Sequence, residues 1–329
     1  MYNKQKDQKI LFLQIYGIFL VVLGHSPTNY YLNKWIYSFH MPLFMFISGY
    51  LLIYTTSNLK NIDYNNFVRK KLKRLIIPYF LWITIAYIPK YILNSYAKFP
   101  VELSLKSYLI GFLYPKTVAI TFYWFLPTLF FIMLIIVGLY KKLNINTVKL
   151  LIIILILNIL YFPNIGFLNM DGIIKYSLYF VLGIYYFQNK EKFERFLLEK
   201  KELIIITFII LNLNLIIEIN FVKSYLYQSI IAIIGIIFSI CLAEKYIELK
   251  FKFLKFFEGT SYSIYLFSWF PQTAIRIIVE MLDLKVSIFV LTLISFSFGI
   301  GIPFLINKLG GYLVKKEPKL KLLKYILGL

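Results

Sequence analysis

The sequence predicts an all-α, polytopic membrane protein with about ten transmembrane helices. Of its 329 residues, 60% are hydrophobic, whereas about 45–50% of a soluble domain is apolar. Only 16% of the residues are charged, against roughly 25% in soluble proteins. Apolar segments long enough to cross a bilayer recur from end to end. We therefore expect a single membrane domain over residues 1–329 and no separate soluble domain.

Each predicted helix is an apolar run that ends at a polar or charged break. The first run is short, so its helix is expected to begin within the Lys-rich leader, and the fifth run is also short. The longest outer segment, 96–120, is expected to fold back against the membrane surface. In chain order, the predicted helices cover residues 10–25, 37–56, 75–95, 121–140, 148–163, 172–189, 202–220, 224–243, 260–280 and 286–308.

The distribution of Lys and Arg predicts that both termini are cytoplasmic. With the N-terminus inside, the cytoplasmic segments are 1–9, 57–74, 141–149, 190–201, 244–258 and 308–329, and they hold 27 of the 36 Lys and Arg residues. This excess follows the positive-inside rule. It accounts for the net charge of +21 without a nucleic-acid partner. We expect the segment 311–329 to be a basic cytoplasmic tail on anionic membrane lipid.

The chain has only two histidines, and both flank one short outer loop. His25 ends the apolar stretch FLVVLGHSPT, and His40 lies at the start of the second predicted helix. Either histidine could be a polar anchor at the membrane interface. A neutral imidazole can also accept a proton from a hydroxyl group, as a general base does. A metal site is not predicted, because no Asp or Glu occurs from residue 8 to 62.

A dense basic run precedes the third predicted helix. The stretch FVRKKLKRLIIPYF places five cations in six positions, with no acid among them. The positive-inside rule alone can produce such a run. The alternative is a binding site for the phosphates of a coenzyme A donor on the cytoplasmic side. The five cations are Arg69, Lys70, Lys71, Lys73 and Arg74.

Five motifs occur in a characteristic order: FLVVLGHS, FHMPLFMFISGYL, KLKRLIIPYF, YWFLPTLF and GTSYSIYL. In this respect the chain resembles the family-3 integral membrane acyltransferases, which O-acylate bacterial surface sugars. The resemblance covers about residues 9–310. It implies a multi-pass enzyme of the bacterial cytoplasmic membrane with an acyl-CoA donor, acetyl-CoA being the usual one. The implied acceptor is a hydroxyl of a glycan or glycolipid at the outer face.

The resemblance also implies roles for individual residues. His25 matches the family's essential histidine, and Lys71 and Arg74 match the basic pair that holds the donor. The family usually has a cation eleven residues before the histidine, where this chain has Gln14, and many members have a histidine near the position of Ser268. The predicted catalytic residue is His25, the donor-binding residues are Lys71, Arg74, Arg69 and Gln14, and the outer-site residues are His40, Ser48, Tyr123, Trp124 and Ser268.

Two other functions compete with a membrane O-acyltransferase. An exporter of a polysaccharide intermediate would need coupling carboxylates in the spans and an inverted repeat. The spans have almost no acids away from their ends, and we find no repeat. A catalytically inactive relative, serving as an assembly partner, is the other alternative, because Gln14 replaces a cation. The sequence favours the acyltransferase.

Overall fold

Helices make up nearly all of the computed structural model, which describes residues 7–56, 58–96, 104–118, 120–160, 165–217, 224–248 and 253–329. This part of the chain is 86% helical and contains no strand, which confirms the predicted all-α class. Six of the described helical segments are long and apolar enough to cross a membrane. The total of about ten spans stays a prediction. The six segments are Gln8–His25, Tyr30–Thr56, Tyr64–Ile92, Thr121–Leu143, Tyr225–Ile247 and Ile288–Lys316.

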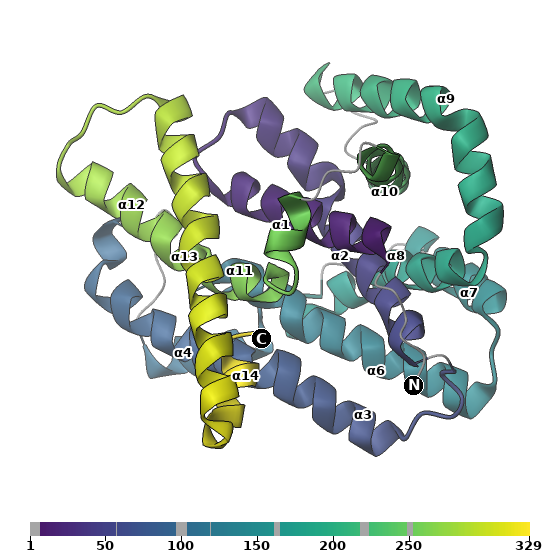
Figure 1. Ribbon diagram of the computed structural model, residues 1–329, viewed down its shortest axis with the longest axis horizontal. Helices are drawn as coiled ribbons and strands as arrows, with labels where there is room; N and C mark the ends of the chain where they lie inside the picture. The colour runs from purple at the N-terminus through teal and green to yellow at the C-terminus, as the bar shows by residue number, and fades with distance from the viewer. Residues whose placement is uncertain are drawn as a thin grey trace.

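The helices keep the labels of Figure 1, and short π- and 3₁₀-segments are labelled η. All ten predicted helices have a counterpart in the structure, and two short helices, α5 and α14, are additional. The helices are α1 (Gln8–His25), α2 (Tyr30–Thr56), α3 (Tyr64–Lys71), α4 (Ile77–Ile92), α5 (Leu105–Leu113), α6 (Phe125–Leu143), α7 (Thr147–Ile159), α8 (Met170–Gln188), α9 (Lys190–Ile217), α10 (Tyr225–Glu248), α11 (Ser261–Phe267), α12 (Trp269–Met281), α13 (Ile288–Lys316) and α14 (Lys321–Ile326).

Helix α2 lies at the centre of the bundle and packs against α1, α8, α9 and α10 (Figure 1). Its crossing with α8 is close because each helix has a glycine at the contact. A Cβ atom on Gly49 would lie 1.8 Å from the carbonyl oxygen of Phe180, and one on Gly183 would lie 2.0 Å from that of Phe46. Small residues at such crossings let membrane helices approach backbone to backbone. This pair of glycines fixes where α2 and α8 meet.

The third predicted helix begins eleven residues earlier than the predicted start at residue 75. The carboxylate of Asp63 accepts a hydrogen bond from the backbone amide of Asn66 at 3.2 Å and caps α3 at its N-terminus. The basic run is therefore helical, and Arg69 and Arg74 are exposed rather than buried. The predicted cytoplasmic segment 57–74 thus includes the first turns of this helix, because exposed charges are compatible with a helix.

A π-helical segment, η1 (Leu72–Ile76), joins α3 to α4 within one continuous helix. Its cause is Pro78, which has no amide hydrogen for the carbonyl of Arg74 and whose ring crowds that carbonyl. The hydroxyl of Tyr262 on α11 donates to the Arg74 carbonyl instead. Proline thus widens the helix at the basic run and ties it to α11.

The ninth predicted helix, 260–280, is divided into α11 and α12 at Ser268. Pro271 has no amide to donate to the carbonyl of Phe267, so the regular hydrogen-bond ladder is interrupted at this point. The predicted charged loop 190–201 is instead helical and forms the start of α9. There, Lys190 and Glu194 form an ion pair of 3.8 Å one helical turn apart.

The C-terminal segment folds back onto the bundle. The indole Nε1 of Trp82 on α4 donates to the carbonyl of Ile326 at 2.9 Å. The hydroxyl of Ser263 on α11 donates to the carbonyl of Leu327 at 2.6 Å. The end of the predicted basic tail therefore packs against α4 and α11, and lipid binding by the rest of 311–329 stays a prediction.

Candidate functional site

A pocket of about 270 Å³ lies between α1, α2, α6, α11 and the joined helix α3–η1. It brings together four of the predicted site residues. Most of its other lining residues are apolar or aromatic, so the pocket suits a ligand with both an anionic part and an apolar part. The four predicted residues are Gln14, Ser48, Lys71 and Arg74.

Lys71 and Arg74 line the pocket together because they lie three residues apart on one helix. The guanidinium of Arg74 lies over the ring of Tyr262, 5.6 Å from its centroid, and the Lys71 ammonium lies 5.3 Å from the centroid of Phe67. Arg69 does not line the pocket and is exposed. It lies two residues before Lys71, which places it on a different face of the helix.

Ser48, predicted as an outer-site residue together with His40, lines the pocket with the two cations. Eight residues of helix α2 separate it from His40, which is a rise of about 12 Å. Ser48 therefore belongs with the predicted donor-binding residues, at the level of Gln14.

His25 lies outside the pocket lining, at the end of α1. Its ring packs against that of Phe122, with the centroids 4.7 Å apart. The hydroxyl of Tyr37 lies 3.5 Å from its Nδ1, and the Tyr37 ring also contacts His40 at 4.8 Å between centroids. The two histidines therefore share one aromatic neighbour, Tyr37.

His40 is buried, and its Nδ1 donates to the carbonyl of Ile36 at 2.8 Å within α2. That bond fixes the Nδ1–H tautomer and leaves Nε2 as an acceptor. This hydrogen bond orients the His40 ring within α2. His25 is half-buried, and its Nδ1 faces the Tyr37 hydroxyl.

Three other predicted outer-site residues, Tyr123, Trp124 and Ser268, lie in the interior of the bundle or stack on another helix. Tyr123 is buried, and its hydroxyl donates to the carbonyl of Leu266. Trp124 stacks on Tyr176 at 5.1 Å. Ser268 is buried, and its hydroxyl has no hydrogen-bond partner in the described part of the chain. Of the residues 121–124, it is Phe122 that contacts His25.

A family model described as an acyltransferase domain matches residues 9–308, which is nearly the whole chain. The chain belongs to this acyltransferase family. The predicted family resemblance is therefore confirmed. No curated protein and no solved structure matches the chain. The family match and the apolar helices together support a multi-pass membrane acyltransferase.

Sequence reasoning missed three residues near His25 of this acyltransferase. Phe122 and Tyr37 contact its ring, and Gln272 holds the end of α1. The side-chain amide of Gln272 donates to the Val22 carbonyl at 2.8 Å and to the Ser26 hydroxyl at 2.9 Å. Tyr37 could have been found, because it lies three residues before His40 and so on the same helix face. The pairing of Gln272 with α1 has no sequence signal.

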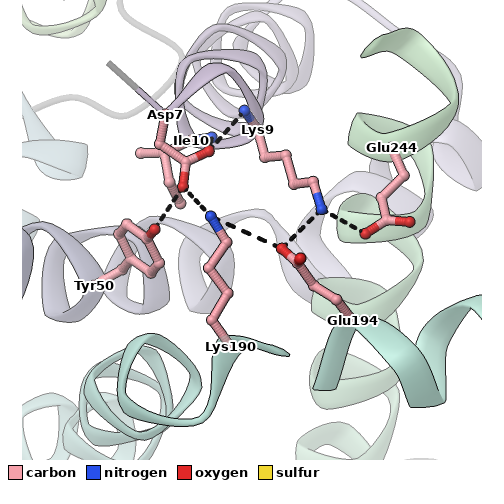
Figure 2. A network of polar contacts seen from close by, with 7 residues as sticks. All are labelled: Asp7, Lys9, Ile10, Tyr50, Lys190, Glu194 and Glu244. Atoms are coloured by element: carbon pink, nitrogen blue, oxygen red, sulfur yellow. Dashed lines mark hydrogen bonds and ion pairs between the residues drawn. The ribbon is translucent and has the colours of Figure 1, made fainter. Parts of the chain in front are cut away.

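The start of α1 is held by a network of charges from four helices (Figure 2). Asp7 accepts hydrogen bonds from Tyr50 at 2.6 Å and from Lys190. Lys9 binds two carboxylates, those of Glu194 and Glu244, at 2.7 Å each. The network joins α1 to α2, α9 and α10. It fixes the position of α1, and with it Gln14 and His25, relative to the rest of the acyltransferase.

The pKa of Asp7 reflects this network. Burial alone would raise it, but the hydrogen bonds from Lys190 and Tyr50, the charge of Lys190 and the Lys9 amide together outweigh burial. The pKa of the Asp7 carboxyl therefore lies below its ordinary value of 3.8. The charged form of Asp7 is the form that the folded enzyme stabilises.

Proposed function

We propose that this membrane acyltransferase is an O-acyltransferase. It moves an acyl group from a cytoplasmic acyl-CoA to a hydroxyl of a cell-surface or exopolysaccharide sugar. The observation that carries the proposal is the pocket, in which Lys71 and Arg74 lie beside apolar walls. The charge pattern favours a cytoplasmic position for the basic run, on the side where acyl-CoA is available.

In this proposal, the pocket binds the donor at two levels. Lys71 and Arg74 hold the phosphates, with Arg74 contributing the planar, multiple donors that suit a phosphate. Gln14 on α1 and Ser48 on α2 also line the pocket and offer hydrogen bonds to the amide groups of the pantetheine arm. The apolar wall accommodates the rest of that arm. Acetyl-CoA is the first donor to test, because the family resemblance implies acetyl as the usual acyl group.

His25 acts as the general base in the transfer. Its neutral imidazole takes the proton of the sugar hydroxyl as the oxygen attacks the thioester carbonyl. A C–O bond forms, the C–S bond breaks, and the thiolate leaves and is protonated. Tyr37, 3.5 Å from the Nδ1 of His25, positions the ring. The acceptor is a glycan or glycolipid on the outer side of the bacterial cytoplasmic membrane.

The proposal is tested with membranes that contain the enzyme, radiolabelled acetyl-CoA and a cell-envelope glycan fraction. Wild type and His25→Ala are compared at matched expression. The proposal is supported if the wild type transfers label to the glycan and His25→Ala does not. Equal label from both proteins removes His25 as the base. No transfer by wild type, but transfer by Gln14→Arg, would favour an inactive relative.

A further inference from the structure

The pocket ends in a ring of aromatic side chains on the side facing His25. Along α2, its lining residues run from Thr55 to Phe44, and Phe44 lies one turn from His40. On α6, the lining residue nearest to Phe122 is Phe125, and on α11 it is Tyr265. Each of the three helices thus contributes one aromatic ring to the same end of the pocket.

These rings contact one another and form a partition. The centroids of Phe44 and Phe125 are 6.1 Å apart, and those of Phe125 and Tyr265 are 5.6 Å apart. Behind them, the Phe122 ring lies 5.6 Å from Tyr265 and 4.7 Å from His25. The contacts thus run without interruption from the pocket lining through Phe122 to the ring of His25.

Of the three rings, Phe44 is the one most able to move. Phe125 and Tyr265 are buried, with 8% and 6% of their surface exposed, whereas Phe44 is half-buried. The hydroxyl of Tyr265 also donates to the Phe122 carbonyl at 2.8 Å. The Phe44 ring lies over Gly17 of α1, where an added Cβ would be 3.2 Å from it. Gly17 therefore leaves the ring just enough room beside α1.

We propose that Phe44 is a gate that sets the size of the acyl group passing from the pocket to His25. The inference rests on the proposed function. With the native ring in place, a short acyl group passes and a longer one is excluded by the partition. Removing the ring enlarges the passage. Adding a methyl group at Gly17 pushes the Phe44 ring toward Phe125 and narrows the passage.

The test compares transfer from acetyl-, butyryl- and hexanoyl-CoA by wild type, Phe44→Ala, Phe44→Leu and Gly17→Ala. We expect the butyryl-to-acetyl rate ratio to rise by about tenfold or more in Phe44→Ala, as for added methylenes in an apolar site. Phe44→Leu gives a smaller rise in the same direction and protects the test if the alanine variant does not fold. Gly17→Ala lowers the ratio.

The matched control is Phe131→Ala, since Phe131 is also half-buried but does not line the pocket. The butyryl-to-acetyl rate ratio of Phe131→Ala should stay at the wild-type value. An unchanged ratio in both Phe44 variants overturns the gate. Binding of unacylated CoA, measured by displacement of a fluorescent CoA, separates the gate from the proposed function. If the wild type binds CoA and transfers the acyl group, but the butyryl-to-acetyl ratio is unchanged in the Phe44 variants, only the gate is contradicted. Wild type that neither binds CoA nor transfers contradicts the proposed function, and the gate with it.

Discussion

At the scale of single residues, the two histidines differ in what their ring nitrogens contact. The Nδ1 of His40 is used by its own helix, whereas that of His25 faces the Tyr37 hydroxyl. We expect His25→Ala to lower the acyl-transfer rate about 10²–10⁴-fold, the usual contribution of a general base. His40→Ala should mainly lower the melting temperature. Rates and thermal unfolding of both variants check this, and the reverse pattern would exchange the two roles.

The pocket predicts how the basic run divides between binding and surface charge. Lys71→Ala and Arg74→Ala each remove one of the charged contacts proposed to hold acyl-CoA, and such a contact is worth about 1.5–3 kcal/mol. The KM for acyl-CoA should rise about tenfold or more in each variant. Arg69→Ala is the matched control, because Arg69 lies in the same run but outside the pocket. An equal rise in all three would indicate general attraction by the basic surface.

The sequence could predict part of the site, and particular residues show why it could not predict all of it. Lys71, Arg74 and Gln14 were assigned from motifs, and the structure brings them into one pocket. Phe122 was missed, because a 3₁₀ turn over Thr121–Trp124 decides which aromatic ring faces His25. No periodicity in the sequence indicates that turn. Ser48, predicted with the outer-site residues, lines the pocket with the two cations, because the eight residues of α2 between it and His40 separate them by about two helical turns.

At the scale of elements, the crossing of α2 and α8 depends on two glycines. Gly49→Ala or Gly183→Ala would place a methyl group against a backbone carbonyl, which cannot move without separating the helices. We expect a loss of about 1–3 kcal/mol of stability for each, as for other overpacked sites. Gly301→Ala in α13 is the control, since its added Cβ meets nothing within 4 Å.

Thermal unfolding in detergent measures these losses. Gly301→Ala should be neutral or slightly stabilising, because alanine is the better helix former. A normal melting temperature for both α2–α8 variants would show that the crossing has more room than the structure indicates.

The helices themselves were predicted well, and their ends less well. Apolar runs identified a helix in every predicted place, because burial in lipid or protein requires such runs. The starts of α3 and α9 were missed, because both begin in charged sequence stabilised by contacts. These are the Asp63 cap and the Lys190–Glu194 pair. The division of the ninth helix depends on Pro271. The sequence alone does not show whether a proline kinks a helix or divides it in two.

At the scale of the whole molecule, the charge network at the start of α1 makes stability depend on pH. Because the folded pKa of Asp7 is lowered, its contribution is complete above the ordinary value of 3.8 and is lost as the pH falls through the folded pKa. Asp7→Asn keeps a capping side chain but removes the charge. We expect it to cost about 1–3 kcal/mol at pH 7.

Melting temperatures of wild type and Asp7→Asn, measured from about pH 3 to 7, check this prediction. The difference between the two curves should be constant at higher pH and should shrink below about pH 3.8, as the pH falls toward the folded pKa of Asp7. Curves that stay parallel would show that the charge of Asp7 does not stabilise the folded enzyme.

The proposed orientation of the chain predicts which loops a membrane-impermeant thiol reagent can reach. Cys241 is the one cysteine of the sequence, so Cys241→Ala gives a background without thiols. In that background, Tyr31→Cys should react in intact cells, and Asn61→Cys only after the membrane is permeabilised. Both positions are exposed. The opposite result would place the basic run outside and contradict a cytoplasmic donor.

The charge network also constrains when α1 can reach its final position during synthesis. Lys9 pairs with Glu244, 235 residues further along the chain, and Asp7 pairs with Lys190, 183 residues further along. A ribosome completes α1 long before either partner exists. Asp7 and Lys9 must therefore stay hydrated at the membrane surface while the central helices insert. The acyltransferase then closes around its first helix only after α9 and α10 have been made, so assembly of the site is a late, post-insertion event.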